Sequence, residues 1–362
     1  MDCEQTIAYA TEEFNAGHFH SVPSILNECL TSANRDQRQR AHLLLTQTYL
    51  LLDDPIGAQR SYLEVLSANP EFVPSEQLHA IDIVYLSKRF TATPKFSWFV
   101  GAGSNVSPVR VIVNNSMFEP GSDQKKEKHK YLVRPGYNFG VGGEYGYNDN
   151  LKLRLEANFL QGSYKLEAVN QFDDDFRGFI ERQTWVNIPL YICYSDNVGT
   201  YRPYGYAGVS VSSLLIAKAS IETERVTRLN SEDGGSDRFP AASPDIDLLR
   251  RRNRLNQSMI FGGGLKYKVG LDFVFVDLRY SAGLKNIVNP DYVFANATAK
   301  QNESGYVEYV DSQLPMSYGH RDDFFRLDNL TFTIGFLRPL YKPREIKRAR
   351  TKGVLRKMKR EK

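Results

Sequence analysis

The sequence has no long hydrophobic run. No stretch of its 362 residues reaches the roughly 18 consecutive apolar residues that a membrane-spanning helix needs, and its mean hydropathy is −0.43. Membrane-spanning helices are therefore excluded. A membrane β-barrel is not, because its strands alternate apolar and polar residues, and these average out in a hydropathy window.

Cysteine is scarce as well. Three cysteines are too few for a disulfide framework, and their spacing does not suit a zinc site. The one glycine run, at 262–264, lies inside a strand pattern and is not a phosphate-binding loop. We therefore expect no metal and no cofactor.

Charge of one sign is concentrated only at the end of the chain. The formal net charge is +4, but residues 342–362 hold eleven Lys/Arg and two Glu, a local +9, so the remainder sums to −5 (4 − 9). We treat 342–362 as a basic tail that binds peptidoglycan carboxylates, a membrane surface or an acidic protein, or is simply solvated. Its central cations are Lys347, Arg348, Arg350, Arg356 and Lys357.

Residues 2–90 show the period of helices, with apolar residues three and four positions apart. Asp54-Pro55 has the form of a helix start, with Asp as the cap and Pro in the first turn, and Asn69-Pro70 closes that helix. A last helix is predicted over about 75–90. We therefore expect a small helical domain over 1–92.

The helical segment contains a weak internal repeat. Tyr49, Ala58, Tyr62, Val65 and Pro70 follow the tetratricopeptide (TPR) pattern, and an earlier copy is degenerate. A generic antiparallel helical hairpin is the alternative, and either arrangement presents a groove. The predicted partner-binding residues in that groove are Phe14, Phe19, Tyr49 and Tyr62.

Cys3 and Cys29 fall on consecutive predicted helices. In an oxidising compartment a disulfide between them would hold down the N-terminus. Two unrelated thiols, or a lipidated Cys3, fit the sequence too.

After Pro94 the period changes to two. Residues 96–338 divide into eight alternating segments, and the segment 151–159 is a clear example, with leucines, an alanine and a phenylalanine against Lys, Arg, Glu and Asn. We expect eight antiparallel strands forming a domain over 93–341.

The polar face of these segments combines glycine with charges of both signs. Glycine weakens a solvated strand face but makes room inside a narrow barrel. An interior of paired charges and glycines with an apolar exterior is typical of a small membrane barrel, whereas a soluble β-sandwich is the alternative. The predicted interior network is Glu144, Lys152, Arg154, Glu156, Asp277 and Arg279.

The connections alternate in length. Short ones are expected at about 148–150, 195–201 and 269–272, and long ones at about 107–130, 164–180, 222–256 and 285–325. Short periplasmic turns and long external loops are the outer-membrane pattern, and an even number of strands puts both termini in the periplasm. Aromatic residues near the short turns suit an interfacial belt: Tyr145, Tyr147, Tyr194, Tyr204, Tyr206, Tyr267 and Phe336.

The chain resembles outer-membrane β-barrel proteins of the Bacteroidota type that carry an N-terminal TPR-like domain. The resemblance rests on Phe14-Asn15-Ala16-Gly17, on Leu51–Pro55, on Gly101–Asn105 and on Val186–Leu190, which looks like the fourth strand of PorT-like or OmpA-like eight-stranded barrels. It implies an outer-membrane location and service in secretion, gliding or assembly complexes.

One group of residues has a catalytic composition. His320, Asp322 and Asp323 in the last long loop, with the acidic run 173–175 in the second, are similar to the Asp/His and Asp/Asp pairs of omptin-type proteases. Those enzymes have ten strands, however, and acidic loop tips are the alternative. We expect no catalytic residues. The basic loop 125–130, which includes His129, is a candidate contact for lipopolysaccharide phosphates.

These features predict a non-enzymatic outer-membrane anchor or scaffold in a protein complex, with the partner bound by the periplasmic helical domain. A narrow pore is the alternative, although small barrels are usually filled by side chains. An outer-membrane hydrolase is less favoured, because omptin-type enzymes have ten strands and eight are predicted here. The expected partners are outer-membrane lipids, lipopolysaccharide and proteins, with peptidoglycan at the tail, and no nucleic acid.

Overall fold

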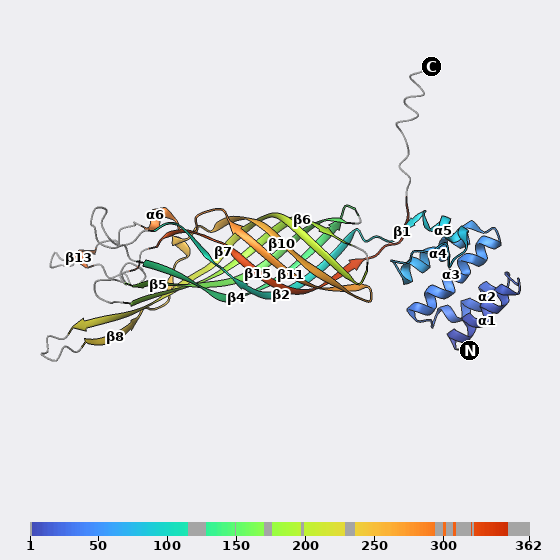
Figure 1. The fold of residues 1–362 in the computed structure, drawn as a ribbon, viewed down its shortest axis with the longest axis horizontal. Helices are drawn as coiled ribbons and strands as arrows, with labels where there is room; N and C mark the ends of the chain where they lie inside the picture. Colours follow the sequence, from blue (N-terminus) through green and yellow to red (C-terminus); the bar gives the residue numbers. More distant parts are fainter. Residues whose placement is uncertain are drawn as a thin grey trace, which may run out of the picture. The chain divides into compact units, whose positions relative to one another are not determined.

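The computed structural model describes residues 2–114, 128–148, 150–169, 176–196, 199–228, 236–293, 300–301, 307–308, 320 and 322–346 (Figure 1). The chain divides into two compact units. One combines Met1–Lys95 with Leu340–Lys362, and the other is Phe96–Pro339. Each unit is considered by itself below.

The first unit is helical. The Asp54 carboxylate accepts hydrogen bonds from the backbone N–H groups of Ile56 (3.2 Å) and Gly57 (3.0 Å), so the expected cap is present. The last helix starts at Ile81 rather than near residue 75, because a turn over 76–78 precedes it. None of the helices in the described residues is long and apolar enough to cross a membrane. The helices are α1 (Cys3–Asn15), α2 (Val22–Leu30), α3 (Arg35–Leu51), α4 (Pro55–Ala68) and α5 (Ile81–Ser87).

A disulfide and a short pair of strands complete this unit. A disulfide joins Cys3 at the start of α1 to Cys29 in α2. Strand β1 (Phe90–Thr91) pairs antiparallel with β16 (Arg344–Glu345), and an Arg89–Glu345 ion pair of 2.7 Å lies beside them. Residues 344–345, predicted as part of a basic tail, thus belong to the fold of the helical unit.

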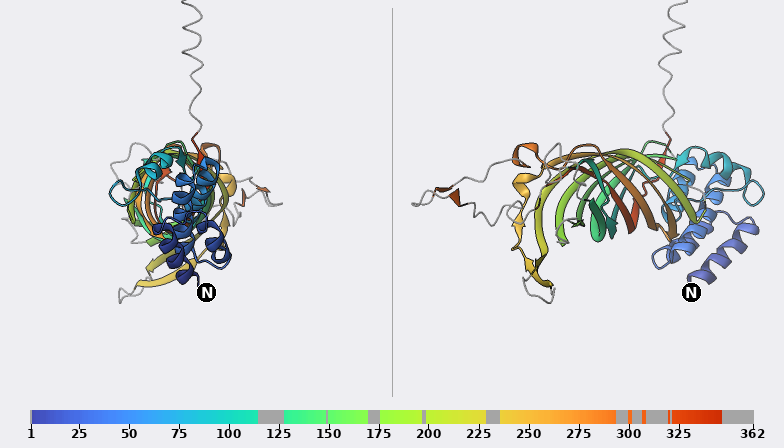
Figure 2. Two further views of the ribbon diagram at one scale, coloured as in Figure 1. Left: turned by 90° about the vertical axis from the view of Figure 1, so that its right-hand side faces the viewer. Right: turned by 60° about the vertical axis from the view of Figure 1, so that its left-hand side comes forward.

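The second unit is a closed antiparallel barrel of eight strands (Figures 1 and 2). Each strand pairs with its neighbour in sequence, the last pairs with the first, and β7 pairs with β10 across the long connection. The expected architecture is therefore confirmed. The strands are β2 (Phe96–Val106), β4 (Lys128–Gly146), β5 (Leu151–Val169), β6 (Phe176–Ser195), β7 (Tyr201–Arg228), β10 (Leu255–Val269), β11 (Asp272–Gly283) and β15 (Asn329–Leu340).

Smaller elements lie at the end of the barrel remote from the short turns. Among them, β3 pairs antiparallel with β14. These elements are β3 (Val109–Val113), β8 (Ser236–Ala242), β9 (Ile246–Asp247), the 3-10 helix η1 (Leu249–Arg251), α6 (Pro290–Val293), β12 (Lys300–Gln301), β13 (Val307–Glu308) and β14 (Phe324–Leu327).

The apolar face of the strands is on the outside of the barrel. Large apolar side chains such as Phe139 (52%), Leu155 (54%) and Ile192 (57%) are exposed there, whereas Glu144 and Arg154 are buried inside. Such a surface is stable only against an apolar phase, so the exterior has the polarity of a lipid-facing wall.

Two predicted long connections begin too early. In the predicted connection 222–256, β7 continues to Arg228 and β8 pairs with its end. Residues 164–180 were expected to be a loop, but β5 runs to Val169 and β6 starts at Phe176. Beyond Leu160 the alternation continues, but apolar residues now face inward and polar residues face outward. Leu160, Tyr164 and Leu166 point inward and are buried, while Gln161, Ser163, Lys165 and Glu167 lie on the outer face. The strands thus leave the lipid-facing zone and continue as a β-structure with an ordinary apolar core.

Glycine on the inner face makes room for aromatic rings. A Cβ atom on Gly142 would lie 2.4 Å from the Phe99 ring, and one on Gly264 would lie 2.6 Å from the Tyr204 hydroxyl. Tyr204 and Tyr206 were predicted in the interfacial belt, but they are buried inside the barrel because they share a strand face with Ser210 and Ser212. Their hydroxyls therefore need polar partners in the lumen.

Candidate functional site

The lumen near the short turns is closed by ion pairs around Glu144. This carboxylate on β4 lies 2.8 Å from Arg154 Nε, 3.0 Å from Lys266 Nζ and 3.9 Å from Lys152 Nζ. The Arg154 guanidinium also lies 4.2 Å from the centre of the Phe99 ring. Charges and rings here fill the cross-section of the barrel.

A second layer of ion pairs lies further along the lumen, by one to two of the two-residue repeats of a strand. Arg279 binds Glu156 through two hydrogen bonds, of 2.7 Å and 3.2 Å. The Asp277 carboxylate accepts hydrogen bonds from the hydroxyls of Tyr204 (2.8 Å) and Tyr206 (2.6 Å). The six predicted interior residues are thus distributed over two stacked layers, and Lys266 and the tyrosines join them.

Above these layers lies a small polar cavity of about 50 Å³. It has room for water molecules but not for a larger ligand. Its polar lining includes Asn158, Asn187, Ser210, Ser212, Asn256, Ser258 and Asn329.

The far end of the barrel is closed by an apolar core. Inward-facing residues of β5, β6 and β7 pack against residues supplied by the connections that follow β7 and β11. The connections contribute Ile246, Leu248, Ile287, Val288 and Phe325. We call this cluster, with the strand residues it contacts, the outer cap.

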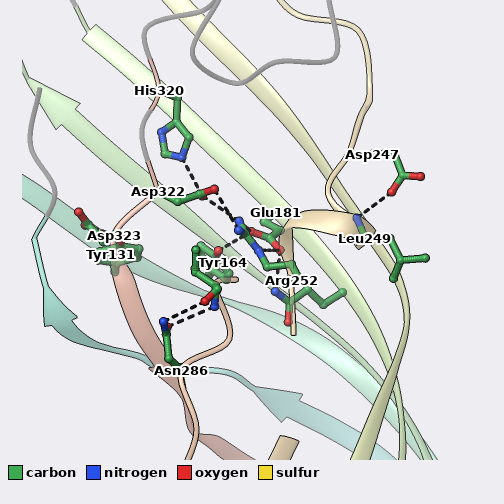
Figure 3. Close-up of polar contacts among 12 residues, drawn as sticks. Tyr131, Tyr164, Glu181, Asp247, Leu249, Arg252, Asn286, His320, Asp322 and Asp323 are labelled. Atoms are coloured by element: carbon green, nitrogen blue, oxygen red, sulfur yellow. Dashed lines mark hydrogen bonds and ion pairs between the residues drawn. The ribbon is translucent and has the colours of Figure 1, made fainter. Parts of the chain in front are cut away.

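A buried polar cluster crosses the outer cap (Figure 3). Arg252 lies between two carboxylates: its Nη2 is 2.6 Å from Glu181 Oε2 and 2.9 Å from Asp322 Oδ1. Tyr164 donates a hydrogen bond to Glu181, and His320 lies 3.4 Å from Asp322. The Arg252 and Glu181 side chains are fully buried.

The second acidic residue of this loop has separate partners. Asp323 is 1% exposed and accepts hydrogen bonds from Tyr131 and His129, each at 2.7 Å. His129 therefore lies in β4 with its side chain buried, and not in an exposed lipopolysaccharide-binding loop as predicted; residues 125–127 lie outside the described part of the chain. Asp322 and Asp323 are likewise not acidic loop tips.

Burial and charge act in opposite directions on Asp322. Burial raises the pKa of this carboxyl, but the Arg252 guanidinium and the hydrogen bonds from His320 and Arg252 lower it more, so the pKa lies well below its usual range. Asp322 is therefore an ion-pair partner and not a proton acceptor poised near neutral pH. Asp322, Asp323 and His320 are all buried, and each is held by the contacts described above.

The other predicted site residues are dispersed. Tyr62 is 1% exposed and packs against Phe90 in the helical core, so it cannot serve as a partner-binding residue. Phe14 and Phe19 are half-buried and in contact with each other, and Tyr49 is half-buried against both helical cores. Asp173–Asp175 and the tail cations from Lys347 onward lie outside the described residues. Among those that are described, no group of acidic, His and Cys side chains could hold a metal ion.

Sequence reasoning missed Glu181 and Arg252. Lys266 shares the phase of Gly262 and Gly264, so the strand pattern does place it on the polar inner face. Glu181 lies next to the segment 164–180, which the sequence predicts to be a loop. Arg252 lies in a long connection, and no local pattern indicates its burial.

The eight closed strands, the apolar exterior and the ion-paired lumen define a small membrane β-barrel. A family model described as "Outer membrane protein beta-barrel domain" matches residues 92–289, more than half of the chain. The chain belongs to this family and is an outer-membrane protein.

Three solved structures to which the chain is similar are distant from it in sequence. OprG of Pseudomonas aeruginosa is 12% identical, with 70% of this chain and 99% of that one covered and a TM-score of 0.35. The protease OmpT of Escherichia coli is 11% identical, with 69% and 98% covered and a TM-score of 0.32. Neisserial surface protein A is 12% identical, with 68% and 97% covered and a TM-score of 0.29. No curated protein matches the sequence.

Proposed function

We propose that the protein is a non-enzymatic, non-conducting outer-membrane anchor whose helical unit binds a protein partner in the periplasm. The observation that carries the proposal is the filled lumen. Two ion-paired layers around Glu144 and Glu156 and the apolar outer cap lie one above another inside the barrel. A barrel closed in this way serves to hold the chain in the membrane rather than to pass solutes through it.

The connections support the proposed orientation. The turns at 147–150, 196–200 and 270–271 are short, whereas the connections at the other end of the barrel are long. Because short turns face the periplasm in outer-membrane barrels, the helical unit and the C-terminus are then periplasmic as well.

The helical unit has features of a partner-binding domain. The hairpins α1–α2 and α3–α4 follow each other with helix starts 32 and 33 residues apart (35 − 3 and 55 − 22), which supports the TPR-like interpretation. Apolar side chains remain exposed on α5 and just before it: Val73 (82%), Leu78 (82%), Ile81 and Tyr85. We propose this apolar group, with the half-buried Phe14, Phe19 and Tyr49, as the partner-binding surface.

The remaining partners follow from charge and location. A basic C-terminal segment in the periplasm would be attracted to peptidoglycan carboxylates, and lipopolysaccharide surrounds the barrel. The resemblance to barrels of Bacteroidota-type bacteria is the reason to look for the partner among secretion, gliding and assembly machinery.

Conductance tests the non-conducting part of this proposal. The full chain, folded as judged by heat-modifiable migration, is inserted into planar lipid bilayers. We expect no current steps above the bare bilayer. Reproducible steps that disappear when the same preparation is heat-unfolded would establish the narrow-pore alternative.

Co-purification tests the partner-binding part. The tagged full chain is extracted in mild detergent, and bound proteins are quantified against the bait. We expect a partner at near-equal amount, lost in Leu78→Ser/Tyr85→Ser. It should be retained in Tyr9→Ser/Leu51→Ser, which removes exposed apolar side chains from α1 and α3. Equal recovery with both variants would contradict the proposed surface.

A further inference from the structure

The outer wall of the barrel changes polarity along three neighbouring strands. The continuous apolar outer face ends at Phe159 on β5, Val186 on β6 and Ile216 on β7, and beyond it Ile180 is an isolated apolar residue on β6. The next outward-facing positions are polar: Gln161 on β5, Thr184 and Arg182 on β6, and Lys218 on β7. This level is where the hydrocarbon of a bilayer ends and lipid headgroups begin.

The wall is hollowed at this level. A groove of about 410 Å³ lies over β5, β6 and β7, within the size range of small-molecule sites. Its lining is apolar on one part and polar on the other. A β-bulge in the pairing of β6 with β7 turns Leu215 and Ile216 outward together, so the groove floor is locally widened. The lining is Tyr137, Phe159, Gln161, Ile180, Arg182, Thr184, Leu215, Ile216, Lys218, Ala219, Ser220 and Asp245.

Two cations, Arg182 and Lys218, border this groove; Asp245 is the acidic residue of its lining, and Asp247 is opposite Lys218 in the β7–β9 register. Arg182 and Lys218 are opposite each other in the β6–β7 register, and both are exposed. Neither forms an ion pair or side-chain hydrogen bond with another residue of the described ranges, and Arg134 continues the same row on β4. Like charges directly opposite each other destabilise a strand pair. A bound anion would remove that repulsion.

We propose that this groove binds the phosphorylated headgroup of an outer-leaflet glycolipid. The phosphate lies between Arg182 and Lys218, where charge-assisted hydrogen bonds are available. The side chains of Gln161, Thr184, Ser220 and Asp245 supply donors and acceptors for sugar hydroxyls. These sugar-binding groups favour a glycolipid over a phospholipid.

The acyl chains of this lipid contact a separate, aromatic part of the outer wall. Below the polar lining, Tyr137 and Phe159 are stacked with ring centres 6.5 Å apart, and both face outward. The location in the outer leaflet rests on the orientation proposed above. The binding itself rests on neither that orientation nor the protein partner, so it is measured in a system without leaflets.

Native mass spectrometry of the full chain in dodecyl maltoside tests the site, with diphosphorylated lipid A as the probe. The test variant is Arg182→Gln/Lys218→Gln. The control is Arg338→Gln/Lys342→Gln, which makes the same charge change at two residues that are not part of the groove lining. We expect one lipid to bind preferentially and its affinity to fall at least about tenfold in the test variant only. Heat-modifiable migration verifies that each variant is folded.

Two comparison lipids identify what is recognised. Lipid A without its phosphates should bind the wild-type chain no better than it binds the test variant. Phosphatidylglycerol should bind more weakly than lipid A. Equal loss of lipid A binding in both variants, or no loss in either, overturns the site. Equal affinity for phosphatidylglycerol overturns the glycolipid assignment.

Discussion

Arg252 forms the central ion pairs of the outer cap. It is fully buried and holds two carboxylates, Glu181 and Asp322, from different parts of the chain. Desolvating three charges is unfavourable, and mutual attraction with near-ideal hydrogen bonding offsets the cost. Removal of the cation would leave two buried carboxylates close together without compensation.

Arg252→Met is therefore expected to destabilise the outer cap by about 3–5 kcal/mol. The control is Arg250→Met in the same segment, where the side chain is exposed; it should change stability by less than about 0.5 kcal/mol. Urea unfolding followed by Trp185 fluorescence measures both. Trp185 is buried in the cap, and Trp98→Phe removes the other tryptophan. Similar midpoints for the two variants would contradict the role assigned to Arg252.

The lowered pKa of Asp322 predicts a pH dependence. A carboxyl whose pKa is lower in the folded than in the unfolded state stabilises the fold above its unfolded pKa, about 3.9, and loses that contribution as pH falls toward the folded value. The stability difference between the wild type and Asp322→Asn should therefore be constant at neutral pH and shrink below about pH 4. A difference that shrinks already between pH 8 and 6 would assign the effect to another group.

At the scale of the strand, we expect the position of a glycine to affect stability more than the number of glycines does. A Cβ atom on Gly142 would lie 2.4 Å from Phe99 and 2.5 Å from the carbonyl oxygen of Leu155, whereas on neighbouring Gly143 its nearest contact is 3.7 Å. Gly142→Ala should cost about 1–3 kcal/mol through overpacking, and Gly143→Ala should be neutral or slightly stabilising. Unfolding midpoints of the two single variants make the comparison. Equal losses would mean that backbone freedom, not luminal space, decides.

The strands show how far local pattern predicts this fold. The alternation in 151–159 gives the strand, its lipid-facing side and the inward Arg154 and Glu156, because one periodic signal specifies all three. The same signal fails above Leu160, where the polarity of the two faces is exchanged. A search for apolar residues on one fixed face ends there and interprets a continuing strand as a loop.

The candidate site was less predictable than the strands. Glu144 and Arg154 lie on neighbouring strands, and their pairing follows once inward positions are known. The Arg252 cluster joins a long connection, the upper part of β6 and the segment before β14. No spacing in the sequence predicts that these three segments come together. Tyr62 shows the opposite error, since an aromatic residue in a repeat pattern was assigned to binding although the core uses it.

At the scale of the whole molecule, the chain's two units depend on different parts of its C-terminal segment. β15 closes the barrel, and β16 completes the helical unit by pairing with β1. Phe90 of β1 packs in the helical core against Tyr62, so the strand pair stabilises more than the chain end.

Deletion of 344–362 should therefore destabilise the helical unit by about 1–3 kcal/mol through lost backbone hydrogen bonds and the Arg89–Glu345 pair. Deletion of 347–362 alone, which keeps β16, is the control and should have little effect. Limited proteolysis of residues 1–95 measures the first unit, and heat-modifiable migration measures the barrel. If the shorter deletion loosens the helices as much, the basic segment and not β16 stabilises them.

The pairing of β1 with β16 also has a consequence for the timing of folding. Arg89 and Glu345 are 256 residues apart, and the ribosome makes the first long before the second. The helices can form early, but their last strand waits until the entire barrel sequence has been synthesised. A chain cut short inside the barrel therefore has neither the closing strand of the barrel nor the β16 partner of β1, and both units are left with unpaired strand edges.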